Sequence, residues 1–304
     1  MNTNQTIRHG LVQRAASDKL HLLPEGVFAG LLVSIAFYLG VSSIYLPENL
    51  GAFIQQTCVL LFFGVVVSVQ RLYQHHRWVK IGRCLLFLGF ISLLYNALAA
   101  LAFNNVPWLS DGLLYGYDRF LRLDVIHTRI APAITQFLWQ TECLSLAYAA
   151  FIPYLTISIF LYGAHRDTQL SELFLLSVAL LYAFGFLGYL FVPAHGPVIH
   201  LAEQITTPIN GGFFHSLVTT SVDQAGGPHG AFPSIHVGAA VFLCLFDFRH
   251  GSRTRAWLYL PLVLLIALAT VLLRYHYVID LLAGVLIAVA AMFVAERWTA
   301  KQRR

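Results

Sequence analysis

Two short stretches of this 304-residue chain carry residue types that can do acid–base and nucleophilic chemistry. The first is GAFPSIHVG at 230–238, and the second is RYHYVID at 274–280. Both lie at the edges of long apolar runs, where a polar or charged side chain costs free energy unless it has a partner or a function. The candidate site residues are Ser234, His236, Arg274, His276 and Asp280.

In the first stretch, Ser234 follows Pro233 and is a natural N-cap for a helix that begins there. The first N–H groups of a helix have no partner within it, and the helix dipole is positive at that end, so the end attracts anions. His236 falls in the first turn, beside the place for an anion, and is the better candidate for a general acid. Gly230 and Gly238 permit close approach of the backbone.

In the second stretch, His276 and Asp280 are four residues apart and share one helical face. A carboxylate that accepts from one imidazole nitrogen leaves the other nitrogen as a lone pair aimed at a substrate. His276 is therefore the better nucleophile, and Asp280 is the residue that orients it. Arg274 can neutralise an anionic phosphate. Two histidines in different environments predict an acid and a nucleophile that work near neutral pH.

The elements that position these residues are transmembrane helices. The chain is 58% hydrophobic and 11% charged, with a mean hydropathy of +0.70, and ordinary soluble domains do not combine these values. Apolar runs of about 20 residues are long enough to cross a bilayer. We predict an all-α, multi-pass helical bundle of eight spans, the shortest at 234–248. The spans lie near 27–46, 51–70, 84–103, 143–163, 173–193, 234–248, 256–273 and 276–295.

The basic residues set the orientation of these spans. With the N-terminus inside, the cytoplasmic segments hold 15 of the 19 lysines and arginines, and the other side keeps four. This positive-inside distribution places both termini in the cytoplasm and both motifs at one depth on the non-cytoplasmic side. Topology thus accounts for the net charge of +5, and we expect no nucleic-acid partner. We expect the plasma membrane, although a Golgi-type membrane fits the same pattern.

No linker, repeat or low-complexity tract divides the chain, which we interpret as one membrane domain over 1–304. The stretch 104–141 mixes aromatic, aliphatic and charged residues and predicts one or two amphipathic helices in the membrane interface, either a structural lip or a gate for a lipid. The polar stretch 194–233 holds four histidines but no H-x-x-x-H or similar pair, so we predict no metal site and no cofactor. These histidines are His195, His200, His215 and His229.

The two motifs together resemble the second and third signature motifs of the type 2 phosphatidic acid phosphatase superfamily. Their residue patterns, GAFPS-x-H and HY-x-x-D, are most similar to those of the inositol phosphorylceramide synthase branch. The resemblance covers mainly 173–290. It implies a six-helix core that acts on lipid phosphates without a metal. It also implies that His276 forms a phosphohistidine, that Asp280 orients His276, that His236 protonates the leaving group and that Ser234 contacts the phosphate.

The sequence departs from this family at the cationic positions. The third motif of the family commonly carries Ser-Arg where this chain has Ala269 and Thr270, and the Lys and Arg-Pro of its first motif are absent. Arg274 is our candidate for the missing charge, and His195, in VPAHGP, stands near the place of the first motif. The expected substrate-binding residues are therefore Ser234, Arg274, Gly230 and His195.

We expect a membrane phosphatase or phosphotransferase that acts on a lipid phosphate or a phospholipid headgroup through a phosphohistidine, similar to inositolphosphotransferases, with an alcohol as acceptor. The alternative is a plain lipid phosphate phosphatase that uses water and acts on phosphatidate or a polyprenyl diphosphate. The competing class is non-enzymatic, a transporter or a haem- or metal-binding protein. A transporter would carry its polar residues near mid-bilayer in broken helices, whereas here they lie at span ends.

Overall fold

The computed structural model describes residues 23–45, 77–104, 108–205, 207–224 and 230–302, together with the single positions 54, 57, 58, 61 and 227. Every regular element in these ranges is a helix, which confirms the all-α prediction. Apart from those single positions, the predicted span at 51–70 lies outside the described residues. His229 and the basic residues of the N-terminal segment lie outside them as well.

Helices occupy the other seven predicted spans. They are α2 (Leu23–Tyr45), α4 (Arg77–Asn104), α7 (Leu138–Ala149) with α8 (Phe151–Gly163), α9 (Thr168–Phe191), α12 (Ile235–His250), α13 (Arg253–Leu272) and α14 (Val278–Gln302). Within the described ranges, five stretches are long and apolar enough to cross a membrane, in α4, α7 with α8, α9, α13 and α14. They mark the chain as an integral membrane protein. Helix α12 has 16 residues, fewer than the usual span, as its apolar run predicts.

The two long segments between spans also form helices. The first contains α5 (Asp111–Phe120), the π-helical turn η2 (Ile126–Ile130) and α6 (Ala131–Thr135). The second, interpreted from its sequence as a polar loop, contains α10 (Pro197–His200) and α11 (Phe213–Gln224). Helix α11 forms because Val218 packs into an apolar cluster with Leu144 and Tyr148 of α7.

By its internal contacts the chain divides into two compact units, residues 1–90, 159–183 and 291–304 in unit 1 and residues 91–158 and 184–290 in unit 2. In unit 1, Arg83 of α4 is buried between Glu25 of α2 and Glu172 of α9. Its Nη2 donates to one carboxylate oxygen of each glutamate at 2.9 Å. A buried guanidinium with paired carboxylates thus ties three helices together.

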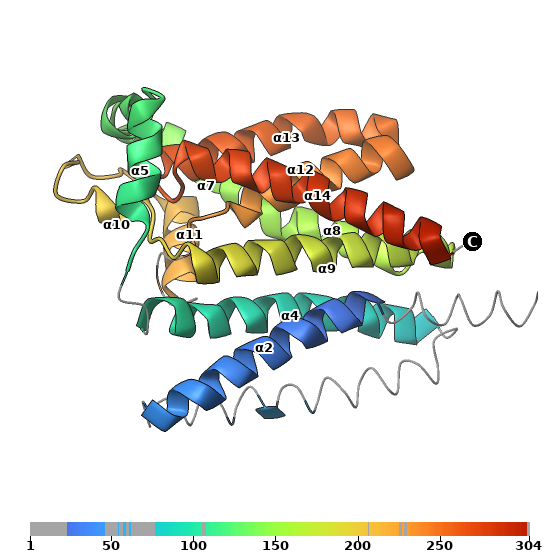
Figure 1. Cartoon of the computed structure of the whole chain (residues 1–304). Helices are drawn as coiled ribbons and strands as arrows, with labels where there is room; N and C mark the ends of the chain where they lie inside the picture. The colour runs from blue at the N-terminus through green and yellow to red at the C-terminus, as the bar shows by residue number, and fades with distance from the viewer. Residues whose placement is uncertain are drawn as a thin grey trace, which may run out of the picture. The chain divides into compact units, whose positions relative to one another are not determined.

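Unit 2 is built around α12 and α13, which pack along each other, with α7 on α13 and α11 on α7 (Figure 1). Helices α12 and α14 approach closely at a pair of glycines. A Cβ on Gly284 would lie 2.5 Å from the carbonyl oxygen of Ser234, and a Cβ on Gly238 would lie 2.9 Å from that of Gly284. The backbone N–H of Ser234 donates to the carbonyl of Asp280 at 3.0 Å. The starts of α12 and α14, and with them the two sequence motifs, therefore lie side by side.

Candidate active site

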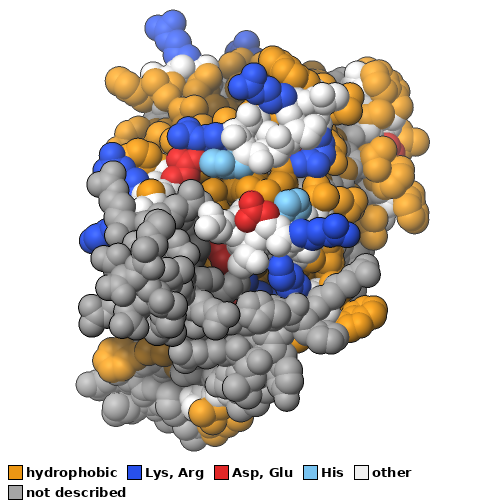
Figure 2. Space-filling view, turned by 90° about the vertical axis from the view of Figure 1, so that its right-hand side faces the viewer, with side chains coloured by type: hydrophobic (Ala, Val, Ile, Leu, Met, Phe, Trp, Pro, Cys, Tyr) orange, Lys and Arg blue, Asp and Glu red, His pale blue; other side chains and the backbone are white. Residues whose placement is uncertain are grey.

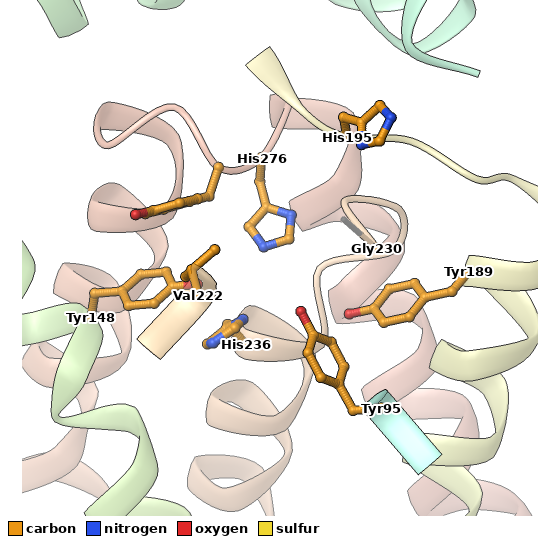
Figure 3. Close-up of a pocket in the computed structure, with 9 residues that line it drawn as sticks. Tyr95, Tyr148, Tyr189, His195, Val222, Gly230, His236 and His276 are labelled. Atoms are coloured by element: carbon orange, nitrogen blue, oxygen red, sulfur yellow. The ribbon is translucent and has the colours of Figure 1, made fainter. Parts of the chain in front are cut away.

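A cavity in unit 2 brings residues of both motifs together (Figure 3). His236 enters from the first turn of α12, and His276 enters from the segment that leads into α14. His195 and Gly230, both expected to bind substrate, lie on loops at its edge. The cavity is lined by Tyr95, Tyr148, Tyr189, His195, Val222, Gly230, His236, Tyr275 and His276.

The protonation pattern of His276 follows from its main-chain partner. Its Nδ1 lies 2.7 Å from the carbonyl oxygen of Ala231, which belongs to the first motif. A carbonyl oxygen only accepts hydrogen bonds, so Nδ1 carries the hydrogen and Nε2 of the neutral ring holds the lone pair. The ring lies in the cavity and is turned toward His236 (Figure 3). The main-chain contact at Nδ1 therefore places the lone pair of the neutral ring on Nε2.

Asp280 lies behind His276 and is fully buried. Its Oδ2 accepts from the backbone N–H of Tyr277 at 2.7 Å, as in one half of a capping box at the start of α14. The same oxygen lies 3.6 Å from Nδ1 of His276, which is longer than a hydrogen bond. The sequence pattern predicted that Asp280 orients the imidazole directly. In the structure the Ala231 carbonyl makes that hydrogen bond, and Asp280 supplies a negative charge beside it.

His236 is held by aromatic rings. Its ring centroid lies 4.6 Å from that of Tyr148 and 4.8 Å from that of Phe151. Ser234 caps α12 as predicted, because its hydroxyl accepts from the backbone N–H of Val237 at 3.4 Å. The serine side chain is fully buried and does not line the cavity. The imidazole of His236, rather than the hydroxyl of Ser234, is the α12 side chain that lines the cavity.

Arg274 does not line the cavity either. It has a left-handed backbone conformation with φ 65°, and Nη1 and Nη2 both donate to the carbonyl of Thr207 at 3.1 Å. Nη2 also lies 3.4 Å from the hydroxyl of Thr135. Burial lowers the pKa of the guanidinium from its ordinary value. Arg274 thus fastens the loop around Thr207 to α6.

Tyrosines form much of the cavity wall, and the sequence reasoning did not single them out. In Figure 3 the hydroxyl groups of Tyr95 and Tyr189 point toward the space beside His236 and His276. Burial raises the pKa of Tyr275 to about 12, so its phenol is neutral at physiological pH. Among the described residues that line the cavity there is no Lys, Arg, Asp or Glu, so these residues offer a ligand neutral hydrogen-bonding groups and imidazoles.

Helix α11 forms another part of the wall through Val222. Glu142 of α7 holds its first turn, because the carboxylate accepts from the backbone N–H groups of Gly212, Phe214 and His215 at 2.9–3.0 Å. Burial lowers the pKa of His215, and the nearby Glu142 carboxylate partly offsets this effect.

Within the described ranges, no group of three or more His, Cys, Asp or Glu side chains is arranged so that it could hold a metal ion.

These features define a polytopic helical membrane protein with two histidines at helix ends in one cavity. Residues 113–294, more than half of the chain, match the family model of the PAP2 superfamily. The chain therefore belongs to that superfamily. Membership supports a phosphatase-type activity on a lipid phosphate. No curated protein matches the chain, and no solved structure matches it. The matched region begins upstream of 173–290, the region in which the sequence motifs indicated the resemblance. It also covers most of α5 and all of α6, α7 and α8.

Proposed function

We propose that this protein is a lipid phosphotransferase of the inositolphosphotransferase type, which transfers a phosphate-ester group from a phospholipid to an alcohol through His276. The observation that carries the proposal is the hydrogen bond from His276 Nδ1 to the Ala231 carbonyl. Because Nδ1 holds the hydrogen, Nε2 holds the lone pair, and the ring lies in the cavity that His236 also lines.

In the first half of the reaction, Nε2 of His276 attacks the phosphorus atom and a P–N bond forms. The P–O bond to the leaving group breaks, and the leaving oxygen takes a proton from His236. The negative charge of Asp280, 3.6 Å from Nδ1, stabilises the positive charge that develops on the His276 ring. A covalent intermediate divides one difficult displacement into two easier ones.

In the second half, His236 has lost its proton and acts as the base. It removes the proton of the acceptor hydroxyl, whose oxygen attacks the phosphorus atom as the P–N bond breaks. The acceptor leaves carrying the phosphate ester. His236 is then protonated again, and His276 is again a neutral ring. This chemistry requires one acid–base group and one nucleophile and no metal ion.

The charge of the cavity favours a phosphodiester donor. A phosphate monoester carries between one and two negative charges near neutral pH, because its second pKa is about 6, whereas a diester carries one. A dianion is usually held by Arg or Lys, and neither residue type occurs among the described residues that line this cavity. The hydroxyl groups of Tyr95 and Tyr189 and the imidazole of His236 suit a monoanion. A phosphodiester donor is a phospholipid headgroup, and its transfer to an alcohol is transferase chemistry.

The charge distribution supports an active site on the non-cytoplasmic side. Within unit 2, α12 begins at the cavity and ends about 24 Å away, at 1.5 Å per residue over its 16 residues. That far end carries Arg249, Arg253 and Arg255. Figure 2 shows one face of the molecule, on which Lys and Arg side chains are set among hydrophobic ones. By the positive-inside rule we infer that the basic end of α12 and both termini are cytoplasmic.

The test is an assay of purified protein in detergent with EDTA, on a panel of phospholipids and lipid phosphate monoesters, with and without added alcohols such as inositol. We expect headgroup transfer that depends on the alcohol, persists in EDTA and is lost in H276A. Phosphate release from monoesters without an alcohol would instead identify a lipid phosphate phosphatase. Full activity of H276A, or loss of wild-type activity in EDTA, would contradict the proposed mechanism.

A further inference from the structure

Helix α5 buries two aspartates on its inner face, whereas its outer face carries large apolar side chains together with the exposed Arg119. Asp111, Leu114 and Asp118 are its buried residues. On the outer face, Leu113 is 61% exposed and Phe120 is 83% exposed. A helix on a water-facing surface has the opposite arrangement, with carboxylates outside and large apolar side chains inside. In an integral membrane protein, this pattern indicates that the outer face of α5 contacts lipid.

Asp118 holds the start of α14. Its Oδ2 accepts from the backbone N–H of Val278 at 2.9 Å, and its Oδ1 accepts from that of Ile279 at 3.1 Å. These are first-turn N–H groups without partners inside α14, and a negative charge at a helix N-terminus is favourable. The fully buried His127 also lies 2.9 Å from Oδ2 through Nε2. The two bonded residues lie between the nucleophile His276 and Asp280.

Asp111 holds the other side of the cavity. Its Oδ2 accepts from the backbone N–H of His195 at 3.0 Å, and its Oδ1 accepts from that of Gly196 at 2.8 Å. Oδ1 also accepts from the phenol of Tyr277, next to His276, at 2.9 Å. The loop at Gly196 has little freedom, because its φ is 92° and a Cβ there would lie 2.3 Å from the carbonyl oxygen of Tyr275.

The two aspartates are seven residues apart, which is about two turns or 10 Å along one side of a helix. One rigid element therefore contacts both the loop that carries His195 and the segment that carries His276. Neither aspartate lines the cavity, so each acts through the backbone that it holds.

We propose that α5 is a lipid-seated positioning helix, in which Asp111 and Asp118 fix the catalytic segment while Leu113 and Phe120 fix the helix in the membrane surface. This inference rests on the proposed function, because its readout is the His276 reaction. A displacement of α5 moves Nε2 of His276 relative to the bound phosphate, and small misplacements of reacting groups reduce rates strongly.

The first test compares D111N and D118N with D124N, a control with the same substitution in the same segment. In D118N the new amide would turn its NH₂ group toward a backbone N–H, so the hold on α14 weakens. We expect kcat to fall by about 100-fold in D118N and about tenfold in D111N, with KM within about twofold of wild type. D118E should recover part of the loss, and D124N should behave as wild type. Wild-type kcat in both D111N and D118N would overturn the positioning role.

The second test uses the outer-face variants L113Q and F120Q, which change exposed side chains and leave the buried face intact. With a long-chain phospholipid in vesicles we expect activity to fall by about fivefold or more, whereas activity on a short-chain, water-soluble analogue in detergent stays at the wild-type level. Equal activities on both substrates in both variants would contradict a lipid-seated α5. An inactive wild type, or an active H276A, would refute the proposed function instead, so the two failures are distinguishable.

Discussion

The imidazole rings of His236 and His276 lie with their centroids 6.0 Å apart, one in the first turn of α12 and the other just before α14. The close contact of Gly238 with Gly284 sets this separation, because it brings the starts of the two helices together. The rings have different partners: aromatic rings surround His236, whereas His276 donates to a carbonyl. One cavity thus holds two histidines suited to different tasks.

Loss of His236 should matter most when the leaving group is a poor one. An alkoxide needs a proton as it departs, whereas a nitrophenolate does not, so general acid catalysis is worth little for an activated ester. We expect H236A to lower kcat/KM by about 10³-fold on a phospholipid and by about tenfold or less on a nitrophenyl phosphodiester. H276A should abolish both reactions. Equal losses on the two substrates in H236A would remove His236 from the acid role.

Asp280 should contribute through its charge more than through orientation. The Ala231 carbonyl already fixes the tautomer of His276, and it remains in place when the carboxylate becomes an amide. We expect D280N to lower kcat by about 10²-fold, less than the roughly 10⁴-fold cost of the same change where the aspartate alone sets the tautomer. Steady-state kinetics of D280N beside H276A measure this difference. A D280N enzyme as inactive as H276A would assign the orienting role to Asp280.

The contact between α12 and α14 has no room for a methyl group at Gly284. A Cβ there meets a backbone atom, the Ser234 carbonyl oxygen at 2.5 Å, which cannot rotate away. We expect G284A to destabilise the protein by about 1–3 kcal/mol and to lower activity, because the two motifs must separate. Thermal unfolding in detergent measures the first effect. G89A is the control, since a Cβ at Gly89 would meet no described atom within 4 Å apart from its own stretch of helix, and its midpoint should not fall.

The buried charges of Arg83, Glu25 and Glu172 in unit 1 should affect stability together and not one by one. Replacing Arg83 by Met leaves Glu25 and Glu172 buried without their cation, which costs about 3–5 kcal/mol. We expect R83M to unfold at a much lower temperature than wild type. A triple variant that also carries E25Q and E172Q should recover most of the loss, because no net charge then remains buried. A triple variant no more stable than R83M would show that packing, not charge, is responsible.

The sequence was sufficient for the helices and for part of the site. The lengths of the apolar runs predicted the positions of helices at seven of the eight expected spans. The inferred topology placed His236 and His276 on the same side of the membrane, and both residues line one cavity. The serine cap on α12 also follows from local sequence, because a cap depends on near neighbours. The helices and the cap are encoded by residues close together in the chain.

The rest depends on contacts between distant segments. Arg274 is two residues from His276, yet its side chain reaches Thr207 because its backbone is left-handed. Tyr95 and Tyr189 sit in apolar spans, where a tyrosine has the same pattern as a core or membrane-interface residue. Asp118 belongs to the segment interpreted as either a structural lip or a gate for a lipid, and nothing near it in the sequence indicates that it binds α14.

The central claim is that His276 carries the phosphate-ester group, through a P–N bond, during the reaction. The most direct measurement is to mix the enzyme with a phospholipid labelled at phosphorus, quench it in alkali, where a phosphohistidine survives, and locate the modified residue by mass spectrometry. We predict label on His276, its release when the alcohol acceptor is added, and no label in H276A. Turnover by wild-type enzyme without label on His276, or label on another residue, would contradict the account.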